Sequence, residues 1–368
     1  MAEDATERQG ALGYPGLDVV KFLMALLVIE IHTNPFFVGG PGLATDIVRG
    51  VDCLAVPFFF IASGFLCFRK VSLNEFCSPD SPSSIRVRET IFRQLRMYLA
   101  WTILYLPITA WADVVAGNSA QKSMLLFVRG TLLIGENQYS WPLWYLLASV
   151  VAFGLIYGLL RSGISPMRVL LFSVVMLFAG FGLGLLRDWN SVSSALKAPV
   201  GLYFKVFGSV RNGLFEGFFY VSVGTVLGIW EQNLQRIPIG VPVVGMAVAL
   251  AGCIFITYDA HLPFCVLLGL SAFLLCIRRQ SPSSPVQSFM RLASIVMYLV
   301  HMMFAVFFAY VICGSTDPDL IMTPTVDHAA MWAFSVVGSL LVSALIVLFS
   351  GKSRVIDFIF SGKPIVDR

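Results

Sequence analysis

The sequence contains few charged residues and few histidines. Charged residues make up 12% of the 368 positions and histidine occurs four times, whereas 57% of the residues are hydrophobic. An ordinary globular protein has about a quarter charged residues. No stretch has the length and polarity of a separate soluble domain. The composition therefore excludes an ordinary soluble protein and predicts a polytopic membrane protein whose helices form one bundle.

Cysteine spacing also excludes two kinds of site. The seven cysteines include no CxxC pair and no cluster with histidine at metal-ligand spacing, so we expect no bound metal. Their odd number, spread over hydrophobic runs, gives no disulfide framework. The net charge of +4 comes from basic residues in short loops, where they set topology. We therefore expect no nucleic-acid partner.

Long apolar runs are what the sequence does contain. A helix needs about 20 mostly apolar residues to cross a bilayer. Runs of this kind predict an all-α bundle of about ten transmembrane helices in a multi-pass membrane protein. They lie near residues 17–38, 52–68, 95–115, 142–160, 168–187, 212–231, 238–257, 262–278, 291–312 and 329–350.

The distribution of basic residues predicts that both termini are cytoplasmic. Basic residues crowd the connection after the second run, from Arg69 to Arg96, and later ones fall on the same side in alternate connections. The acidic and histidine-bearing connections at 258–261 and 317–328 are expected outside. Residues 1–13 lack the features of a secretory signal, so the first helix is expected to stay. We expect a polar tail over 1–13, a membrane domain over 14–355 and a cytoplasmic tail over 356–368.

Lys21 and His32 are ionisable residues eleven positions apart in the first apolar run. On a helix this spacing places them on nearly the same face, about 16 Å apart along the axis. Ionisable groups inside a membrane helix are costly and often functional. The alternative is a snorkelling lysine and a histidine in the headgroup region. Glu30 lies on the opposite face from Lys21 and is expected to contact a different neighbour.

Other polar residues lie at membrane depth or beside it. Arg211, Asn212 and Glu216 could form a polar cluster in a cavity or an interfacial pair that joins two helices. The basic run that contains Arg93 and Arg96 could bind phosphates of a cytoplasmic cofactor or act only as a topology determinant. Two further sets could line a substrate cavity or serve as interfacial and capping residues: the aromatic set Trp141, Trp144 and Tyr145, and the pair Tyr298 and His301.

Five motifs occur in order between about residues 14 and 310. They are Lys21-x10-His32 followed by TNP, AVPFFFIASGF at 55–65, WPLWYL at 141–146, RNGLFEGFF at 211–219 and SIVMYLVH at 294–301. Together they resemble the acyltransferase-3 family of integral membrane O-acyltransferases. The chain looks most like the group that includes surface-glycan acetyltransferases and the membrane part of vancomycin-resistance serine racemases.

The resemblance implies an enzyme that moves an acyl group, commonly acetyl from cytoplasmic acetyl-CoA, to a hydroxyl of a glycan or lipid-linked acceptor across the bilayer. It implies that Lys21 and His32 belong to the active channel. His32 could act as a general base or carry the acyl group. Glu216 could orient His32, Arg211 or Asn212 could stabilise an oxyanion, and Lys21 with Arg93 and Arg96 would meet CoA.

Two other classes of function are left open by the sequence. The similarity to racemase-linked proteins makes a transporter for a small polar solute, such as an amino acid, the main alternative. A scaffold in envelope-polysaccharide assembly is the third. Neither the acceptor nor the oligomeric state follows from the residues, and a homo-oligomer is compatible with them.

Overall fold

The computed structural model describes residues 13–36, 43–189, 193–256, 262–282, 284–315, 325–349, 353 and 360. Within these ranges there is no β-strand, and the regular elements are helices apart from an isolated bridge between Gly13 and Ser281. The all-α prediction is confirmed. The predicted outer connections at 258–261 and most of 317–328, and nearly all of both predicted tails, lie outside the described residues.

The chain forms two compact units. One comprises Met1–Phe59 and Gln232–Lys352, and the other Phe60–Glu231 and Ser353–Arg368. We call them the histidine unit and the arginine unit, after the candidate residues that each contains. The boundaries fall within helices α3 (Ala55–Phe68) and α10 (Glu231–Leu234).

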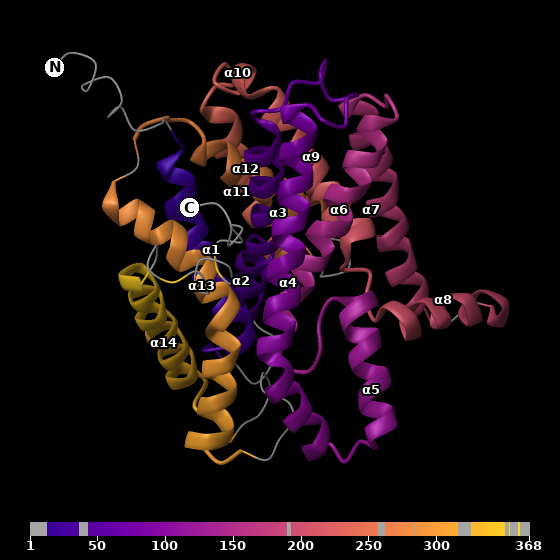
Figure 1. The fold of residues 1–368 in the computed structure, drawn as a ribbon, viewed down its shortest axis with the longest axis vertical. Coiled ribbons are helices and arrows are strands. Elements are labelled where there is room, and N and C mark those ends of the chain that lie inside the picture. The colour runs from indigo at the N-terminus through magenta and orange to yellow at the C-terminus, as the bar shows by residue number, and fades with distance from the viewer. Residues whose placement is uncertain are drawn as a thin grey trace. The chain divides into compact units, whose positions relative to one another are not determined.

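The histidine unit contains a layer in which α1, α13 and α14 lie side by side (Figure 1). Small residues let α1 and α13 approach closely, since Ala25 and Ala293 are fully buried beside Ile29 and Met297. Ser284 caps α13 in a capping box with Gln287. The bounds are α1 Pro15–Thr33, α13 Pro285–Phe307 with its continuation η5 Phe308–Ile312, and α14 His328–Phe349.

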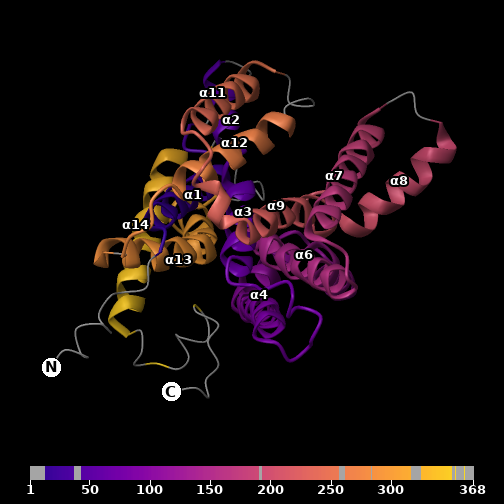
Figure 2. The ribbon, with the colours of Figure 1, turned by 90° about the horizontal axis from the view of Figure 1, so that it is seen from above.

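A second group of helices in this unit is formed by α2, α11 and α12 (Figure 2). Helix α11 packs against both others and supplies the buried residues Ala249 and Cys253, while α12 supplies Cys265 and Leu268. The bounds are α2 Leu43–Asp52, α11 Gly240–Phe255 and α12 Leu262–Cys276.

In the arginine unit, α6 packs against α4 and α9, and α9 also contacts α7. Helices α3 and α9 approach so closely that a Cβ atom at Gly64 or Gly224 would overlap the facing backbone, and small residues allow this kind of contact between membrane helices. The bounds are α4 Pro82–Val115, α5 Ala120–Arg129, η1 Gly130–Ile134, η2 Trp141–Leu143, α6 Trp144–Arg161, α7 Pro166–Asp188, α8 Ser194–Phe207, η3 Gly213–Gly217 and α9 Phe218–Ile229.

Six helices of the described chain are long and apolar enough to cross a membrane: Gly50–Phe68, Pro82–Val115, Trp141–Arg161, Pro166–Asp188, Pro285–Ile312 and His328–Phe349. They match six of the ten predicted runs. Three more runs correspond to the shorter apolar helices Gly213–Ile229, Gly240–Phe255 and Leu262–Cys276, and the first run to α1. The chain is thus a multi-pass membrane protein, whereas ten crossings and the orientation of the termini stay predictions.

Helix α4 begins thirteen residues before the predicted start at 95 because Ser81 caps it and Pro82 occupies its first turn. The basic run from Arg86 to Arg96 therefore forms part of the same helix as the third apolar run. Arg86 donates hydrogen bonds to the carbonyl oxygens of Leu66 and Cys67. These bonds satisfy carbonyl groups at the C-terminal end of α3, where a helix leaves them without an internal partner.

Candidate active site

His32 and His301 lie next to each other in the histidine unit. The Nδ1 atom of His32 is 3.2 Å from the Nε2 atom of His301, and the ring centroids are 5.2 Å apart. His32 lies in the last turn of α1 and His301 near the end of α13, where it is fully buried. The close packing of α1 on α13 therefore joins two candidate residues that are 269 positions apart in the sequence.

Hydrogen bonding determines where the protons lie when both rings are neutral. Nδ1 of His301 is 2.8 Å from the carbonyl oxygen of Met297, so Nδ1 carries the hydrogen and Nε2 the lone pair. Nδ1 of His32 faces two acceptors, the carbonyl oxygen of Val28 at 2.8 Å and Nε2 of His301. It must therefore carry the hydrogen, which places the lone pair of His32 on Nε2. This tautomer is the one that a general base or a nucleophile at Nε2 requires.

Glu30 contacts Asp52, a residue that the sequence analysis did not select. The two carboxyl groups lie close enough to interact electrostatically. Glu30 is buried, and its Oε2 atom has no hydrogen-bond partner among the described residues. The contact with Asp52 agrees with the expectation that Glu30 and Lys21 have different neighbours.

Two polar contacts fix the ends of α1 within the histidine unit. At its start, the buried Asp18 accepts hydrogen bonds from Arg291, the shortest 2.6 Å to Nη2. At its end, Nδ1 of the buried His328 donates to the carbonyl oxygen of Thr33 at 2.7 Å. Lys21 lies between them, half-buried on α1. These contacts hold the helix that carries Lys21 and His32.

Arg211, Trp144 and Glu136 form an electrostatic cluster in the arginine unit. The exposed Arg211 guanidinium lies over the indole of the buried Trp144, 5.1 Å from the ring centroid, in a cation–π contact. Burial raises the pKa of Glu136 to about 7, and the positive charge of Arg211 acts in the opposite direction. A carboxyl group with this pKa can both accept and donate a proton near neutral pH.

Sequence reasoning missed Glu136, although one signal was available. It is the only acidic residue between Asp113 and Asp188, and it stands just before the WPLWYL motif. The surrounding loop is held by local contacts. The backbone NH of Asn137 donates to Oγ of Ser140 at 2.8 Å, and Oγ1 of Thr109 donates to the carbonyl oxygen of Gln138 at 3.1 Å.

Asn212 caps the π-helix η3. Its Oδ1 atom accepts from the backbone NH groups of Leu214 and Phe215 at 2.9 and 3.3 Å, and its Nδ2 atom donates to the hydroxyl of Tyr203 at 2.8 Å. This use of both polar atoms favours a structural role for Asn212 over stabilisation of an oxyanion. Glu216 lies half-buried in η3, within electrostatic reach of Arg211.

The remaining candidates occupy separate places. Tyr145 shares a hydrogen bond of 2.8 Å with Ser63. Trp141 contacts the ring of Tyr139, and Tyr298 meets Phe59 edge to face. Arg93 is exposed and Arg96 half-buried in the first half of α4. The candidates therefore divide into two sets. Lys21, His32, Tyr298 and His301 lie in the histidine unit, and Arg93, Arg96, Trp141, Trp144, Tyr145, Arg211, Asn212 and Glu216 in the arginine unit.

A family model described as an acyltransferase domain matches residues 14–348, nearly the whole chain. The chain belongs to the acyltransferase-3 family. This finding confirms the resemblance drawn from the five motifs and supports a membrane acyltransferase.

This chain matches only part of the length of its curated relatives. An amino-acid racemase of Enterococcus faecalis is 27% identical over 60% of this chain and 29% of its own. A serine/alanine racemase of Enterococcus gallinarum is 25% identical over 58% of this chain and 28% of its own. The match thus spans less than a third of each relative. No solved structure matches the chain significantly.

Proposed function

We propose that the protein is an O-acyltransferase of the cell membrane. It moves an acyl group, first of all acetyl, from cytoplasmic acyl-CoA to a hydroxyl group of a surface glycan or lipid-linked acceptor at the outer face. The supporting observation is the contact between His32 and His301 in a chain of the acyltransferase-3 family. The acyl donor, the acceptor and the side of the membrane are parts of this proposal.

In the proposed reaction, the hydroxyl oxygen of the acceptor attacks the thioester carbonyl, and Nε2 of His32 takes up the hydroxyl proton. The carbon–sulfur bond then breaks, the ester forms, and the proton passes from His32 to the CoA thiolate. His301 is a positioning residue, because its Nε2 lone pair accepts from the Nδ1 hydrogen of His32 and favours the reactive tautomer. A route through an acyl group on Nε2 of His32 would use the same tautomer.

Lys21 is proposed to serve the donor. It lies on α1 eleven residues before His32, about 16 Å away along the helix, towards the predicted cytoplasmic end. Its ammonium group is a point charge suited to a phosphate or pyrophosphate of CoA. Arg93 and Arg96 are proposed to act in the same way. Arg211 and Glu216 stay candidates for the acceptor side.

The deciding experiment supplies inside-out membrane vesicles with radiolabelled acetyl-CoA and measures label in membrane material. Vesicles with the protein should incorporate label, and His32→Ala should lose it about 10²- to 10⁴-fold at equal protein level. An exposed residue in the same unit provides a control, Cys313→Ser, which should keep most activity. Near-normal transfer in His32→Ala would remove His32 from the mechanism. Uptake of radiolabelled L-serine without acetyl transfer would instead favour a transporter.

A further inference from the structure

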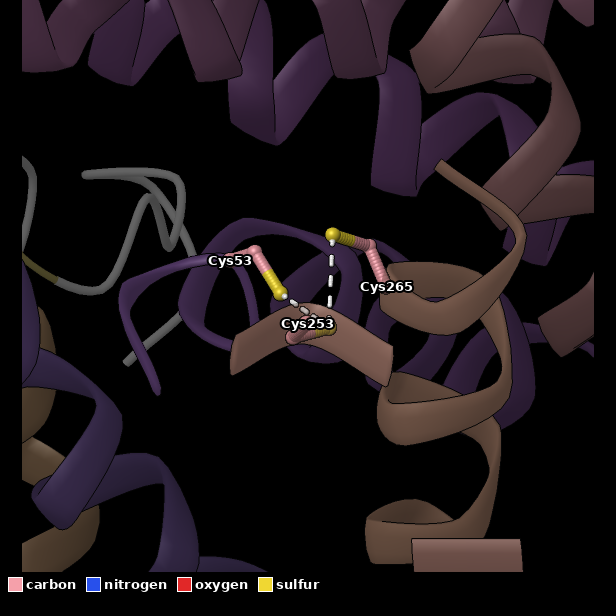
Figure 3. A group of neighbouring side chains, drawn as sticks. All are labelled: Cys53, Cys253 and Cys265. Atoms are coloured by element: carbon pink, nitrogen blue, oxygen red, sulfur yellow. Dashed lines mark hydrogen bonds between the residues drawn. The ribbon is translucent and has the colours of Figure 1, made fainter. Parts of the chain in front are cut away.

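Three cysteines from distant parts of the sequence meet in the histidine unit (Figure 3). Cys53 follows α2, Cys253 lies in α11 and Cys265 in α12. The Sγ atom of Cys253 is 3.5 Å from that of Cys53 and 3.9 Å from that of Cys265, and all three sulfur atoms lie within 4.8 Å of one another. The sulfur of Cys253 contacts both of the others, so the three form a triangle rather than a single pair.

We propose that Cys53, Cys253 and Cys265 form a binding site for one thiophilic d¹⁰ metal ion, Zn²⁺ or Cu(I). The distances fit such a site. With a metal–sulfur bond of about 2.3 Å, three sulfur ligands lie about 3.8 Å apart in tetrahedral and about 4.0 Å apart in trigonal geometry. The separations of Cys253 from Cys53 and Cys265 are within a few tenths of an ångström of these values, and the third separation is below 4.8 Å. A disulfide would require two sulfur atoms to approach to about 2.05 Å, and the third thiol would take no part in it.

The three helices hold the cysteines in place through close backbone contacts. A Cβ atom at Gly50 would be 3.3 Å from the Cβ atom of Cys253, so α2 lies directly on α11. A Cβ atom at Gly252 would overlap the ring of Phe264, which brings α11 equally close to α12. The ligands therefore project from three fixed segments, as a preorganised site requires.

The surroundings of the sulfur atoms are mostly apolar, with the Asp52 carboxyl within electrostatic reach of Cys53. Cys253 and Cys265 are 8% and 5% exposed, Cys53 is half-buried, and Leu268 and Met246 pack in the same cluster. Thiolate ligands select Zn²⁺ and Cu(I) over harder cations. Binding releases three thiol protons to solvent, which leaves a net charge of −1 with Zn²⁺ and −2 with Cu(I). Because buried net charge is costly, the lower charge favours Zn²⁺, with a fourth position available to another ligand.

The sequence predicted no metal because its cysteines show no metal-ligand spacing. The ligands are separated by 200 and 12 residues, so only the packing of α2, α11 and α12 unites them. A metal at this site would link the three helices, and its binding energy would add to the stability of the fold. This inference does not depend on acyl transfer by His32.

Purified full chain in detergent, reduced and treated with a chelator, provides the test. It is incubated with Zn²⁺ or anaerobically with Cu(I), desalted and analysed for bound metal. The wild type should retain about one ion per chain, and Cys253→Ser should bind at least about tenfold more weakly. Cys276→Ser is the matched control on α12, since that thiol donates to the carbonyl oxygen of Ala272 at 3.0 Å. It should bind as the wild type does.

Two further measurements keep the test decisive. Co²⁺ should give thiolate charge-transfer absorption in the wild type but not in Cys253→Ser, and Cys53→Ser repeats the comparison at a less buried position. Retention of copper alone, with the same dependence on Cys253, supports the site and assigns it to Cu(I). Less than a tenth of an equivalent of either metal in folded wild type, or equal retention by Cys253→Ser, would show that the thiols serve only as core packing.

Discussion

Replacement of His301 by phenylalanine removes one acceptor from Nδ1 of His32 and keeps a ring of similar size. The carbonyl oxygen of Val28 remains 2.8 Å from the same nitrogen, so the variant weakens control of the tautomer without abolishing it. One hydrogen bond of this kind contributes about 1–1.5 kcal/mol, which corresponds to a loss of about 5- to 12-fold in turnover. His32→Ala should lose about 10²- to 10⁴-fold. His301→Gln, whose amide oxygen can accept a hydrogen bond, should recover part of the rate.

The assay is acetyl transfer from radiolabelled acetyl-CoA by membrane vesicles with equal amounts of each variant. The loss in His301→Phe should fall on kcat and leave the KM for acetyl-CoA unchanged, because a positioning residue acts on His32 rather than on the donor. A rate within twofold of the wild type would refute a role for the histidine pair. A loss as large as that of His32→Ala would show that His301 itself takes part in proton or acyl transfer.

Three other predictions concern the donor, the topology and Glu136. Lys21→Ala should raise the KM for acetyl-CoA, and Lys21→Arg should keep this KM near the wild-type value. An effect on acceptor dependence alone would show that Lys21 serves the acceptor rather than the donor. The exposed native cysteines Cys77 and Cys313 should differ towards an impermeant thiol reagent in intact cells. Only Cys313 should react, so labelling should be lost in Cys313→Ser and kept in Cys77→Ser. The reverse pattern would invert the predicted topology. Folding raises the pKa of Glu136 from 4.5 to about 7, so protonated Glu136 stabilises the folded protein. This stabilisation is complete below pH 4.5 and is lost as the pH rises through 7. It amounts to at most about 3 kcal/mol. In detergent, the apparent Tm of the wild type should fall over this pH range, whereas that of Glu136→Gln should not. Identical pH profiles of the two proteins would contradict the prediction.

Part of the candidate site could be predicted from residue types and spacing. Lys21 and His32 stand out because ionisable residues in an apolar run are costly, and His301 was selected within a recognisable motif. Asp52 and Glu136 were missed because their significance depends on burial and on partners far away in the sequence. Asn212 was selected for its polarity, but its Oδ1 atom caps η3 and its Nδ2 atom donates to Tyr203. Residue type alone does not distinguish a cap from a catalytic group.

Composition and residue spacing were enough to predict the class and the local structure of this protein. Apolar runs separated by polar connections specify membrane helices, because each helix satisfies its own backbone hydrogen bonds and needs no distant partner. Its motifs were also sufficient to indicate the acyltransferase-3 family.

Which side chains meet depends on how the helices pack. In a membrane helix the lipid-facing and the core-facing residues are both apolar, so hydrophobic periodicity does not show which face contacts a neighbour. The pairing of His32 with His301, the ion pair of Asp18 with Arg291 and the meeting of three cysteines each join residues that are distant in the sequence. These contacts arise from the close approach of particular helices, which small residues such as Ala25, Gly50 and Gly252 allow.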